Sequence, residues 1–315
     1  MRAGISLFVA VFCALFARDA LAVLQPTPGG TPIPKIDTGV SSCSDKNVQR
    51  CLDIGEGTPN LIDALADALV APETFAPTCA LTFTPIVKGG SNGEAFGWYN
   101  VVPDPNDSSK TLKPQNTELY AMMVFGNGFQ TNAQLAGVAP KALDLNAELS
   151  AGHYKGGQIA FWLAAGSGLG INATSGVLTG TPQNVFYTEH AFNPGSGASQ
   201  TYYQVLTWQS VAIENAFYFG WEDLPANSGG DNDFDDLAFL VSGIQCNGGG
   251  EPCDTGELGV CADGSMQCQK GVLSCASNQT ASDETCNALD DNCDGEVDEG
   301  DLCGAEKVCD RGRCV

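Results

Sequence analysis

The strongest constraint on the fold is a series of short, β-rich segments between residues 80 and 244. They are rich in aromatic and β-branched residues, and Gly, Pro, Asn and Asp separate them, as is typical of strands joined by turns. The eight segments are 81–87, 95–102, 118–125, 158–165, 184–189, 201–209, 216–223 and 236–242. Strands and helices do not alternate as they do around a parallel sheet. The pattern therefore predicts an all-β fold, an antiparallel β-sandwich or jelly-roll-like domain.

One short helix is expected before the first of these strands. Thr58 can act as its N-cap, and Pro59 suits the first helical position. Apolar residues then recur on one helical face at Leu61, Ile62, Leu65 and Leu69. We expect this helix to pack against the sandwich, so that the two form one domain over residues 43–245.

The first 22 residues have the organisation of a secretory signal peptide. Arg2 supplies a basic start, an apolar run covers residues 5–16, and Ala-Leu-Ala ends at Ala22. The apolar run is too short to span a bilayer, and no later segment is long enough either. The sequence predicts cleavage near Ala22 and a secreted or cell-surface protein, extracellular or associated with the outer membrane, without a membrane span. Residues 23–42 then form a Pro/Gly-rich spacer.

The cysteines are unevenly distributed along the chain. Of the 14 cysteines, ten lie between Cys246 and Cys314. In an exported chain this density predicts disulfides in a segment too poor in apolar residues to fold by burial alone. We therefore assign residues 246–315 to a separate Cys-rich module. Removal of Cys13 with the signal peptide would leave an odd number of cysteines, and the spacing does not determine their pairing.

The formal net charge of −23 at pH 7 limits the partners of the chain. Such a charge repels nucleic acids and anionic membranes, and it is compatible with divalent cations. Plain solubility is the simpler explanation of the same charge.

A dense group of acidic residues precedes the last predicted strand. The stretch GGDNDFDDLAFLV, residues 229–241, follows a strand that ends in Glu-Asp. If the two strands form a hairpin, their acidic ends meet at one end of the sandwich. The carboxylates concerned are Glu222, Asp223, Asp231, Asp233, Asp235 and Asp236. Oxygen ligands without nearby Cys or His favour Ca²⁺ over other metals. The alternative is that these residues only cap turns in a solvated loop.

A second acidic loop begins at Asp290 and fits the start of a calcium-loop pattern. The candidate ligands are Asp290, Asn292, Asp294, Glu296, Asp298 and Asp301. Gly295 occupies the position of the sharp turn, and Glu296 can contribute its backbone carbonyl. An EF-hand has a bidentate Glu at the position of Asp301. In this loop, Glu299 can supply that carboxylate instead. The flanks are not amphipathic helices, so we expect an isolated metal loop and not an EF-hand domain.

The segment around the first acidic group resembles a known bacterial family. The motifs are FGWYNV (96–101), GGQIAFWL (156–163), FYTEHAFNP (186–194) and GWEDLP followed by GGDNDFDDLAF. They resemble the domain-of-unknown-function 4114 family over residues 80–245. Trp221 replaces the usual Phe of that pattern, and Asp235 stands where Asn is common. The resemblance implies a β-sandwich in a secreted or surface protein, and it implies no particular activity.

The second loop carries its own resemblance. ETCNALDDNCDGEVDEG is similar to the metal-binding motif named after the copper-binding surface protein MopE, with a Cys-rich run before it, over residues 253–300. Ala288 departs from the usual Gly. The label of the motif suggests copper, but the loop offers oxygen atoms and no His, so calcium is the expected ion and copper the weaker alternative. Cys286 and Cys293 are expected in disulfides.

No feature of the sequence predicts an enzyme. His153 and His190 are the only histidines, and the chain contains no catalytic or phosphate-binding motif. We therefore expect no catalytic residue and no cofactor-binding residue. The expected function is a non-catalytic calcium-binding protein in adhesion or in the extracellular matrix, with a surface polysaccharide or another extracellular protein as partner. The alternatives are a calcium-dependent lectin or carbohydrate-active enzyme and, third, a copper-binding surface protein.

Overall fold

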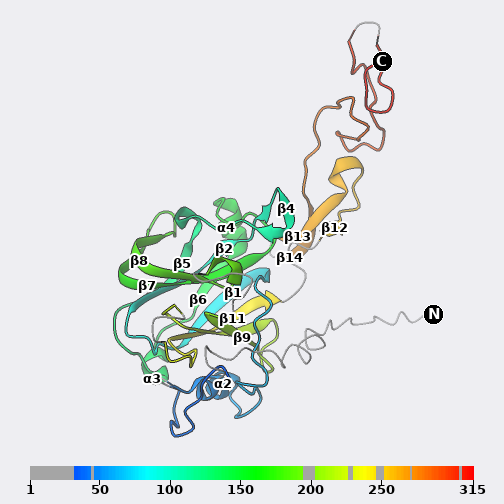
Figure 1. The fold of residues 1–315 in the computed structure, drawn as a ribbon. Helices are drawn as coiled ribbons and strands as arrows, with labels where there is room; N and C mark the ends of the chain where they lie inside the picture. The colour runs from blue at the N-terminus through cyan, green and yellow to red at the C-terminus, as the bar shows by residue number, and fades with distance from the viewer. Residues whose placement is uncertain are drawn as a thin grey trace, which may run out of the picture.

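The computed structural model describes residues 32–43, 46–193, 203–225, 230–245, 252–269, 272–304 and 307–315 (Figure 1). The expected signal peptide and the first part of the expected spacer lie outside these ranges. Within them, no helix has the length and apolar character needed to cross a membrane.

Two antiparallel sheets form the main domain, as the sequence predicts. The five-stranded sheet has the order β6-β1-β11-β10-β9, and the four-stranded sheet has the order β5-β2-β7-β8. The strands of the first sheet are β1 (Ala76–Val87), β6 (Lys141–Asp144), β9 (Val205–Gln209), β10 (Ala216–Trp221) and β11 (Leu237–Gln245). Those of the second are β2 (Gly93–Asn100), β5 (Tyr120–Phe125), β7 (Ile159–Ile171) and β8 (Leu178–Tyr187). Each of the eight predicted segments overlaps one of these strands. The short edge strand β6 was not predicted.

An aromatic core fills the space between the two sheets. The ring of Phe96 on β2 stacks on Phe239 of β11, with centroids 4.3 Å apart, and on Phe161 of β7. Along β10, Phe217 and Phe219 face this core, whereas Tyr218 between them faces the opposite side of the sheet. This alternation is the period of two that a β-strand imposes on its side chains.

The outer face of the five-stranded sheet is covered by residues 32–43 and 46–70, which we call the N-terminal cover (Figure 1). Ile33, Leu52 and Ile62 pack there with Trp208 and Tyr218. The only α-helix in the described part of the cover is α2 (Val48–Glu56), and Asn47 is its N-cap.

The helix predicted from Thr58 onward is wrong. The α2 helix precedes it and ends at Gly57, which has a left-handed φ of 69°. The following residues form turns, because Asp63 accepts hydrogen bonds from the backbone amides of Leu65 and Ala66 in place of a helical ladder. Ile62 is buried, but Leu61 and Leu65 are exposed, so the apolar spacing that suggested a helix does not mark one buried face.

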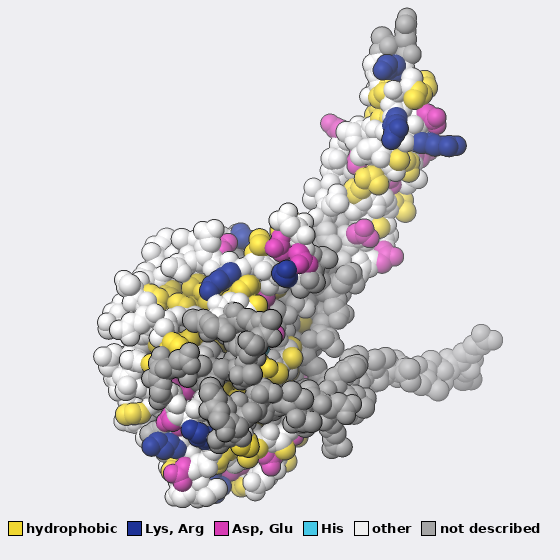
Figure 2. All heavy atoms as spheres, in the orientation of Figure 1, with side chains coloured by type: hydrophobic (Ala, Val, Ile, Leu, Met, Phe, Trp, Pro, Cys, Tyr) yellow, Lys and Arg dark blue, Asp and Glu magenta, His cyan; other side chains and the backbone are white. Residues whose placement is uncertain are grey.

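The remaining elements of the main domain are short. They are β3 (Pro103–Asp104), β4 (Asp107–Thr111), η2 (Asn116–Glu118), α3 (Asn132–Leu135), α4 (Leu145–Ser150) and η3 (His190–Phe192). On the described part of the face shown in Figure 2, acidic and basic side chains are interspersed, and no broad acidic field is visible.

The C-terminal module projects from the sandwich (Figure 1). Disulfides hold this module together. It contains β12 (Pro252–Asp254), η4 (Gly259–Cys261), β13 (Asp263–Gln269) and β14 (Val272–Ser277). Its described disulfides are Cys253–Cys275, Cys261–Cys293, Cys286–Cys309 and Cys303–Cys314. The concentration of disulfides predicted for this region is confirmed. Cys43–Cys51 closes the start of the N-terminal cover, Cys79 is also disulfide-bonded, and no described cysteine is free.

Candidate metal centre

The β10–β11 hairpin brings the two acidic segments together. The strands pair antiparallel, and Trp221 at the end of β10 lies opposite Leu237 at the start of β11. Glu222 and Asp223 therefore leave the sheet beside Asp236, where the acidic loop enters it. The backbone amide of Asp223 donates a hydrogen bond of 2.8 Å to Oδ2 of Asp236.

Three of the acidic side chains converge closely enough to share one ion. Glu222, Asp231 and Asp233 each place a carboxylate oxygen within 4.8 Å of the other two. Glu222 is fully buried and Asp233 is 2% exposed, whereas Asp231 is exposed. The Oε1 atom of Glu222 accepts a hydrogen bond from the Phe234 amide at 2.9 Å. The Asn232 amide also favours the charged form of Glu222, but Oε2 is buried and accepts no hydrogen bond of normal geometry from the described residues. We call these three residues the carboxylate triad.

The backbone of the acidic loop explains how alternate residues face different surroundings. Asn232 and Phe234 both have left-handed backbone angles, with φ of 66° and 59°. The Phe234 ring is fully buried in the cluster beneath the N-terminal cover, so it anchors the loop to the outer face of the sheet. Asp231 and Asp233 can then lie on the opposite side of the loop, near Glu222.

A second group of carboxylates lies next to the triad. Asp223 accepts a hydrogen bond of 2.8 Å from the Asn92 side-chain amide, and the nearby Glu94 is fully buried. The Nζ atom of Lys88, also buried, lies 3.7 Å from Oε1 of Glu94 and donates a hydrogen bond to the Gly90 carbonyl. Lys88 is thus a cation built into the chain at the edge of the acidic group.

Sequence reasoning missed Glu94 and Lys88. The available signal was a single Glu in GGSNGEAFGWYN, where the neighbouring positions of the strand are apolar or Gly. A charged residue at such a position is buried at one end of a strand and requires a partner. Lys88 is likewise a charged residue at the end of an apolar strand segment, directly after Val87.

Three carboxylates of this region, those of Glu222, Asp236 and Glu94, have raised pKa values and hold protons more tightly than isolated ones. Burial, together with the nearby charge of Asp233, raises the pKa of Glu222 to about 8, although the Phe234 hydrogen bond opposes the rise. Burial and the charges of Glu222 and Asp223 raise the pKa of Asp236 to about 9. The pKa of Glu94 is also raised well above its usual value, mainly by burial. Without a cation, these three side chains therefore favour their protonated, neutral form. A bound cation would instead favour the ionised form.

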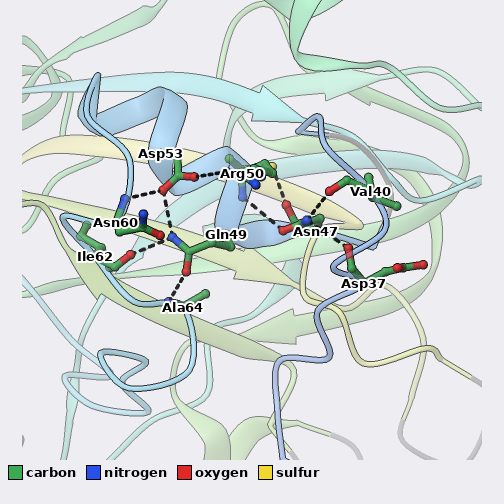
Figure 3. A network of polar contacts seen from close by, with 10 residues as sticks. Asp37, Val40, Asn47, Gln49, Arg50, Asp53, Asn60, Ile62 and Ala64 are labelled. Carbon is green, nitrogen blue, oxygen red and sulfur yellow. Dashed lines mark hydrogen bonds and ion pairs between the residues drawn. The ribbon is translucent and has the colours of Figure 1, made fainter.

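Asp235 connects the acidic loop to the N-terminal cover. Its Oδ2 atom accepts a hydrogen bond of 2.9 Å from the backbone amide of Asn47, and its carbonyl accepts one from Gly89. The Asn47 side chain in turn donates to the carbonyls of Asp37 and Val40 (Figure 3). Asp235 therefore serves to hold the cover, and it is not grouped with the triad.

Gln49 organises the other side of the cover. Its side chain donates to Asp53 and to the Ile62 carbonyl, and it accepts from the Ala64 amide (Figure 3). These contacts fix the turns after α2 against the helix itself.

The second acidic loop brings together part of its predicted set. Asp290 is 4% exposed, and its carboxylate accepts hydrogen bonds from the amides of Asp294 and Gly295. The Asn292 side-chain amide lies 3.2 Å from Oδ2 of Asp294 and 2.6 Å from Oε1 of Glu299. Asp290, Asn292 and Asp294 thus share the loop with Glu299, whose Oε2 is buried and without a hydrogen-bond partner in the described chain.

The other predicted residues of this loop lie elsewhere. The carboxylate of Asp298 faces the neighbouring disulfide knot, where it accepts hydrogen bonds from the amides of Asn287, Ala288 and Gly312. Glu296 and Asp301 are exposed. The sulfur atoms of Cys286, Cys303 and Cys309 also lie close together, but each is oxidised in a disulfide, and thiolates bind metal, not disulfide sulfurs.

Comparison with known proteins gives one match. Residues 154–243 match the family described as domain of unknown function (DUF4114). The matched span runs from the residues before β7 to β11 and so includes the carboxylate triad. The comparisons with curated proteins and with solved structures found no match.

Proposed function

We propose that this chain is an exported, non-catalytic calcium-binding protein that acts in adhesion or matrix interaction at the cell surface. The observation that carries the proposal is the Oε2 atom of Glu222, which is buried beside the oxygens of Asp231 and Asp233 and accepts no hydrogen bond of normal geometry from the described residues. A buried carboxylate oxygen without a partner is costly, and a cation held by all three side chains would supply the missing partner. Export rests on the signal-like sequence of residues 1–22.

The local charge balance supports the same proposal. Seven carboxylates belong to the region, counting Glu94 with the six predicted residues, and Lys88 forms an ion pair with one of them, Glu94. Several of these groups are buried, and burying like charges without compensation is strongly unfavourable. One divalent ion at the triad would offset much of this repulsion.

The donor set favours calcium over the alternatives. Calcium takes six to eight oxygen ligands with flexible geometry, and the triad offers carboxylate oxygens on a loop. Copper prefers imidazole and sulfur ligands, which the triad lacks. Magnesium keeps several waters and needs fewer carboxylates than this region provides.

A second calcium ion is proposed at the loop of the C-terminal module. Its ligands would be Asp290, Asn292 and Asp294 with Glu299, because the side chain of Asp298 is engaged elsewhere. The resemblance of this loop to the MopE-type metal-binding motif adds support for a metal, and its oxygen donors support calcium over copper.

Thermal unfolding of the full chain tests the proposal. Saturation at about 100 times Kd adds about 2.7 kcal/mol of stability, which corresponds to roughly 5–10 °C for a domain of this size. We expect the melting temperature to fall by this amount in EDTA and to be restored by Ca²⁺ but not by Mg²⁺ or Cu²⁺. An identical melt in EDTA and in Ca²⁺ would overturn the proposal.

A further inference from the structure

A cavity of about 740 Å³ lies between the acidic loop and the N-terminal cover. Its lining includes Asp231 and Asp233 from the loop and, from the cover, Pro34, Lys35, Lys46 and Leu65. We call this cavity the cover pocket. Two of the three triad carboxylates therefore belong to its wall, so that a metal at the triad would lie at one end of an open space.

The triad leaves coordination positions for other oxygen atoms. One oxygen of Glu222 is taken by the Phe234 amide, so the three side chains supply fewer oxygens than the six to eight that calcium requires. Asp231 is exposed and is part of the pocket lining. The remaining coordination positions of the ion would therefore be reached from the cover pocket. Water would fill these positions, and a ligand with two adjacent oxygen atoms could replace it.

The lysines of the pocket are available as hydrogen-bond donors. Lys35 and Lys46 are exposed, and neither forms an ion pair within the described chain. The pocket also contains Asp37 and Asp63, but both carboxylates accept hydrogen bonds from nearby backbone amides. The ammonium groups thus offer donors but no acceptors to a ligand that brings its own oxygens.

The cover pocket is held in place by the same contacts that fix the acidic loop. The Lys35 amide donates to the Asn232 carbonyl at 2.8 Å, and the Asp37 amide donates to the Lys46 carbonyl at 2.8 Å. The backbone of Lys35 is therefore fixed to the acidic loop, and the backbone of Lys46 is joined to the same segment of the cover through Asp37. A preformed backbone of this kind reduces the cost of ordering the site, so that mainly the lysine side chains are ordered by a ligand.

We propose that the cover pocket binds a neutral saccharide unit, two adjacent hydroxyls of which complete the coordination of the calcium ion. Lys35 and Lys46 donate hydrogen bonds to its other oxygens, and Pro34 and Leu65 contact the C–H face of the ring. An acidic sugar fits less well, because one calcium ion and two lysines do not fully balance Glu222 and the four aspartates of the pocket, and the whole chain carries −23. This inference rests on the proposed calcium site.

Calorimetric titration of the full chain with methyl α-mannopyranoside and methyl β-galactopyranoside tests the inference. Both sugars present vicinal hydroxyls, and galacturonic acid serves as the acidic comparison. We expect saturable binding of at least one neutral sugar in excess Ca²⁺ and its loss in EDTA. Binding of neither neutral sugar, binding unchanged in EDTA, or binding of galacturonic acid alone would each overturn the proposal.

Paired variants separate this inference from the calcium proposal. Lys35→Met combined with Lys46→Met removes the donors and keeps an unbranched side chain of nearly the same length at both positions. Sugar affinity should fall at least tenfold, while calcium affinity should not fall, because two positive charges near the ion are removed. Lys110→Met, on β4 and outside the pocket lining, should change neither. Calcium binding without sugar binding in the wild type would refute this inference alone, whereas absence of calcium binding would refute the proposed function.

Discussion

The Phe234 amide donates a hydrogen bond of 2.9 Å to Oε1 of Glu222, and the Phe234 ring is fully buried beneath the N-terminal cover. One residue thus joins an acidic centre to an apolar cluster. The hydrogen bond orients Glu222 and uses one of its two oxygens, which leaves Oε2 for a cation. The position of the carboxylate triad is therefore set by core packing as well as by charge.

Replacing Glu222 with Gln separates the orientation of this side chain from its charge. The Gln amide oxygen can still accept the Phe234 hydrogen bond, and the neighbouring carboxylates can accept from its NH₂ group. Glu222, with a pKa of about 8, must take up a proton on folding near neutral pH, whereas Gln is neutral in both states. We therefore expect Glu222→Gln to raise stability in EDTA near neutral pH by at least about 1 kcal/mol. Chemical denaturation measures this change. A destabilised variant in EDTA would show that Glu222 is needed in its charged form without metal.

The raised pKa values predict an unusual pH dependence for the metal-free protein. The pKa values of Glu222 and Asp236 rise from 4.5 and 3.8 to about 8 and about 9. At pH values between the ordinary pKa and the raised pKa of each residue, the folded state keeps a proton that the unfolded state has released. The free energy of unfolding therefore falls as pH rises through this range. Denaturation in EDTA should therefore show lower stability at about pH 8 than at about pH 5.5.

Calcium should change this pH profile, because it binds the deprotonated carboxylates. The stabilisation by saturating Ca²⁺ should be larger at about pH 8 than at about pH 5.5. Stability in EDTA that increases steadily over the same pH range would contradict the assignment of the raised pKa values.

Glu56 provides a test of how the N-terminal cover is attached. Its buried carboxylate accepts hydrogen bonds from Ser210, Tyr218 and the amides of Val211 and Ala212. Glu56→Ala leaves these donors without their acceptor and should reduce the free energy of unfolding by about 3 kcal/mol. The exposed Glu214 is the matched control, and Glu214→Ala should change stability by less than about 0.5 kcal/mol. Equal effects of the two variants would contradict this role.

Gly220 tests the contact between β10 and the acidic loop. A Cβ atom at this position would lie 2.4 Å from the Phe234 carbonyl oxygen and 3.0 Å from the Trp208 ring. Gly220→Ala should displace the loop, reduce stability by about 1–3 kcal/mol and weaken calcium binding. Gly126→Ala is the control, because an added Cβ there meets no atom within 4 Å. Unchanged calcium affinity in Gly220→Ala would show that the loop position does not control the site.

The second loop yields a prediction from two nearby aspartates. Asp290 shares the loop with Asn292 and Asp294, whereas Asp298 binds backbone amides of the disulfide knot. Asp290→Asn should remove calcium binding by the C-terminal module, and Asp298→Asn should leave that affinity within about threefold while lowering stability. Calcium titration of both variants measures the difference. Loss of binding in Asp298→Asn alone would reverse the assignment.

The strands could be predicted because their aromatic and β-branched residues recur between clear turn signals. The same reasoning failed at residues 58–70, where Asp63 satisfies backbone amides locally and the apolar residues pack singly onto the sheet. The helix lies just before, in α2, with Asn47 as its N-cap. Local hydrogen bonding and tertiary packing place the helix at α2 and not at residues 58–70, and the spacing of apolar residues alone does not reveal them.

The convergence of the two acidic segments could also be predicted, because a hairpin places the end of one strand beside the start of the next. The sequence did not allow us to predict which of these acidic residues form the triad and which bind other groups. Asp235 holds Asn47, and the buried Glu94 arrives from another sheet with Lys88 as its partner. These contacts depend on how the sheets and the cover are packed, and neighbouring residues in sequence do not encode them directly.

The most direct test of the central claim is a calorimetric calcium titration of the full chain and of its Asp233→Asn variant. Both should be measured in the Asp290→Asn background, which removes the second proposed site. The carboxylate triad predicts saturable binding of one calcium ion in this background and an affinity at least tenfold weaker when Asp233 loses its charge. No binding in the Asp290→Asn protein, or equal affinity in the two proteins, would contradict the claim that the acidic hairpin binds calcium.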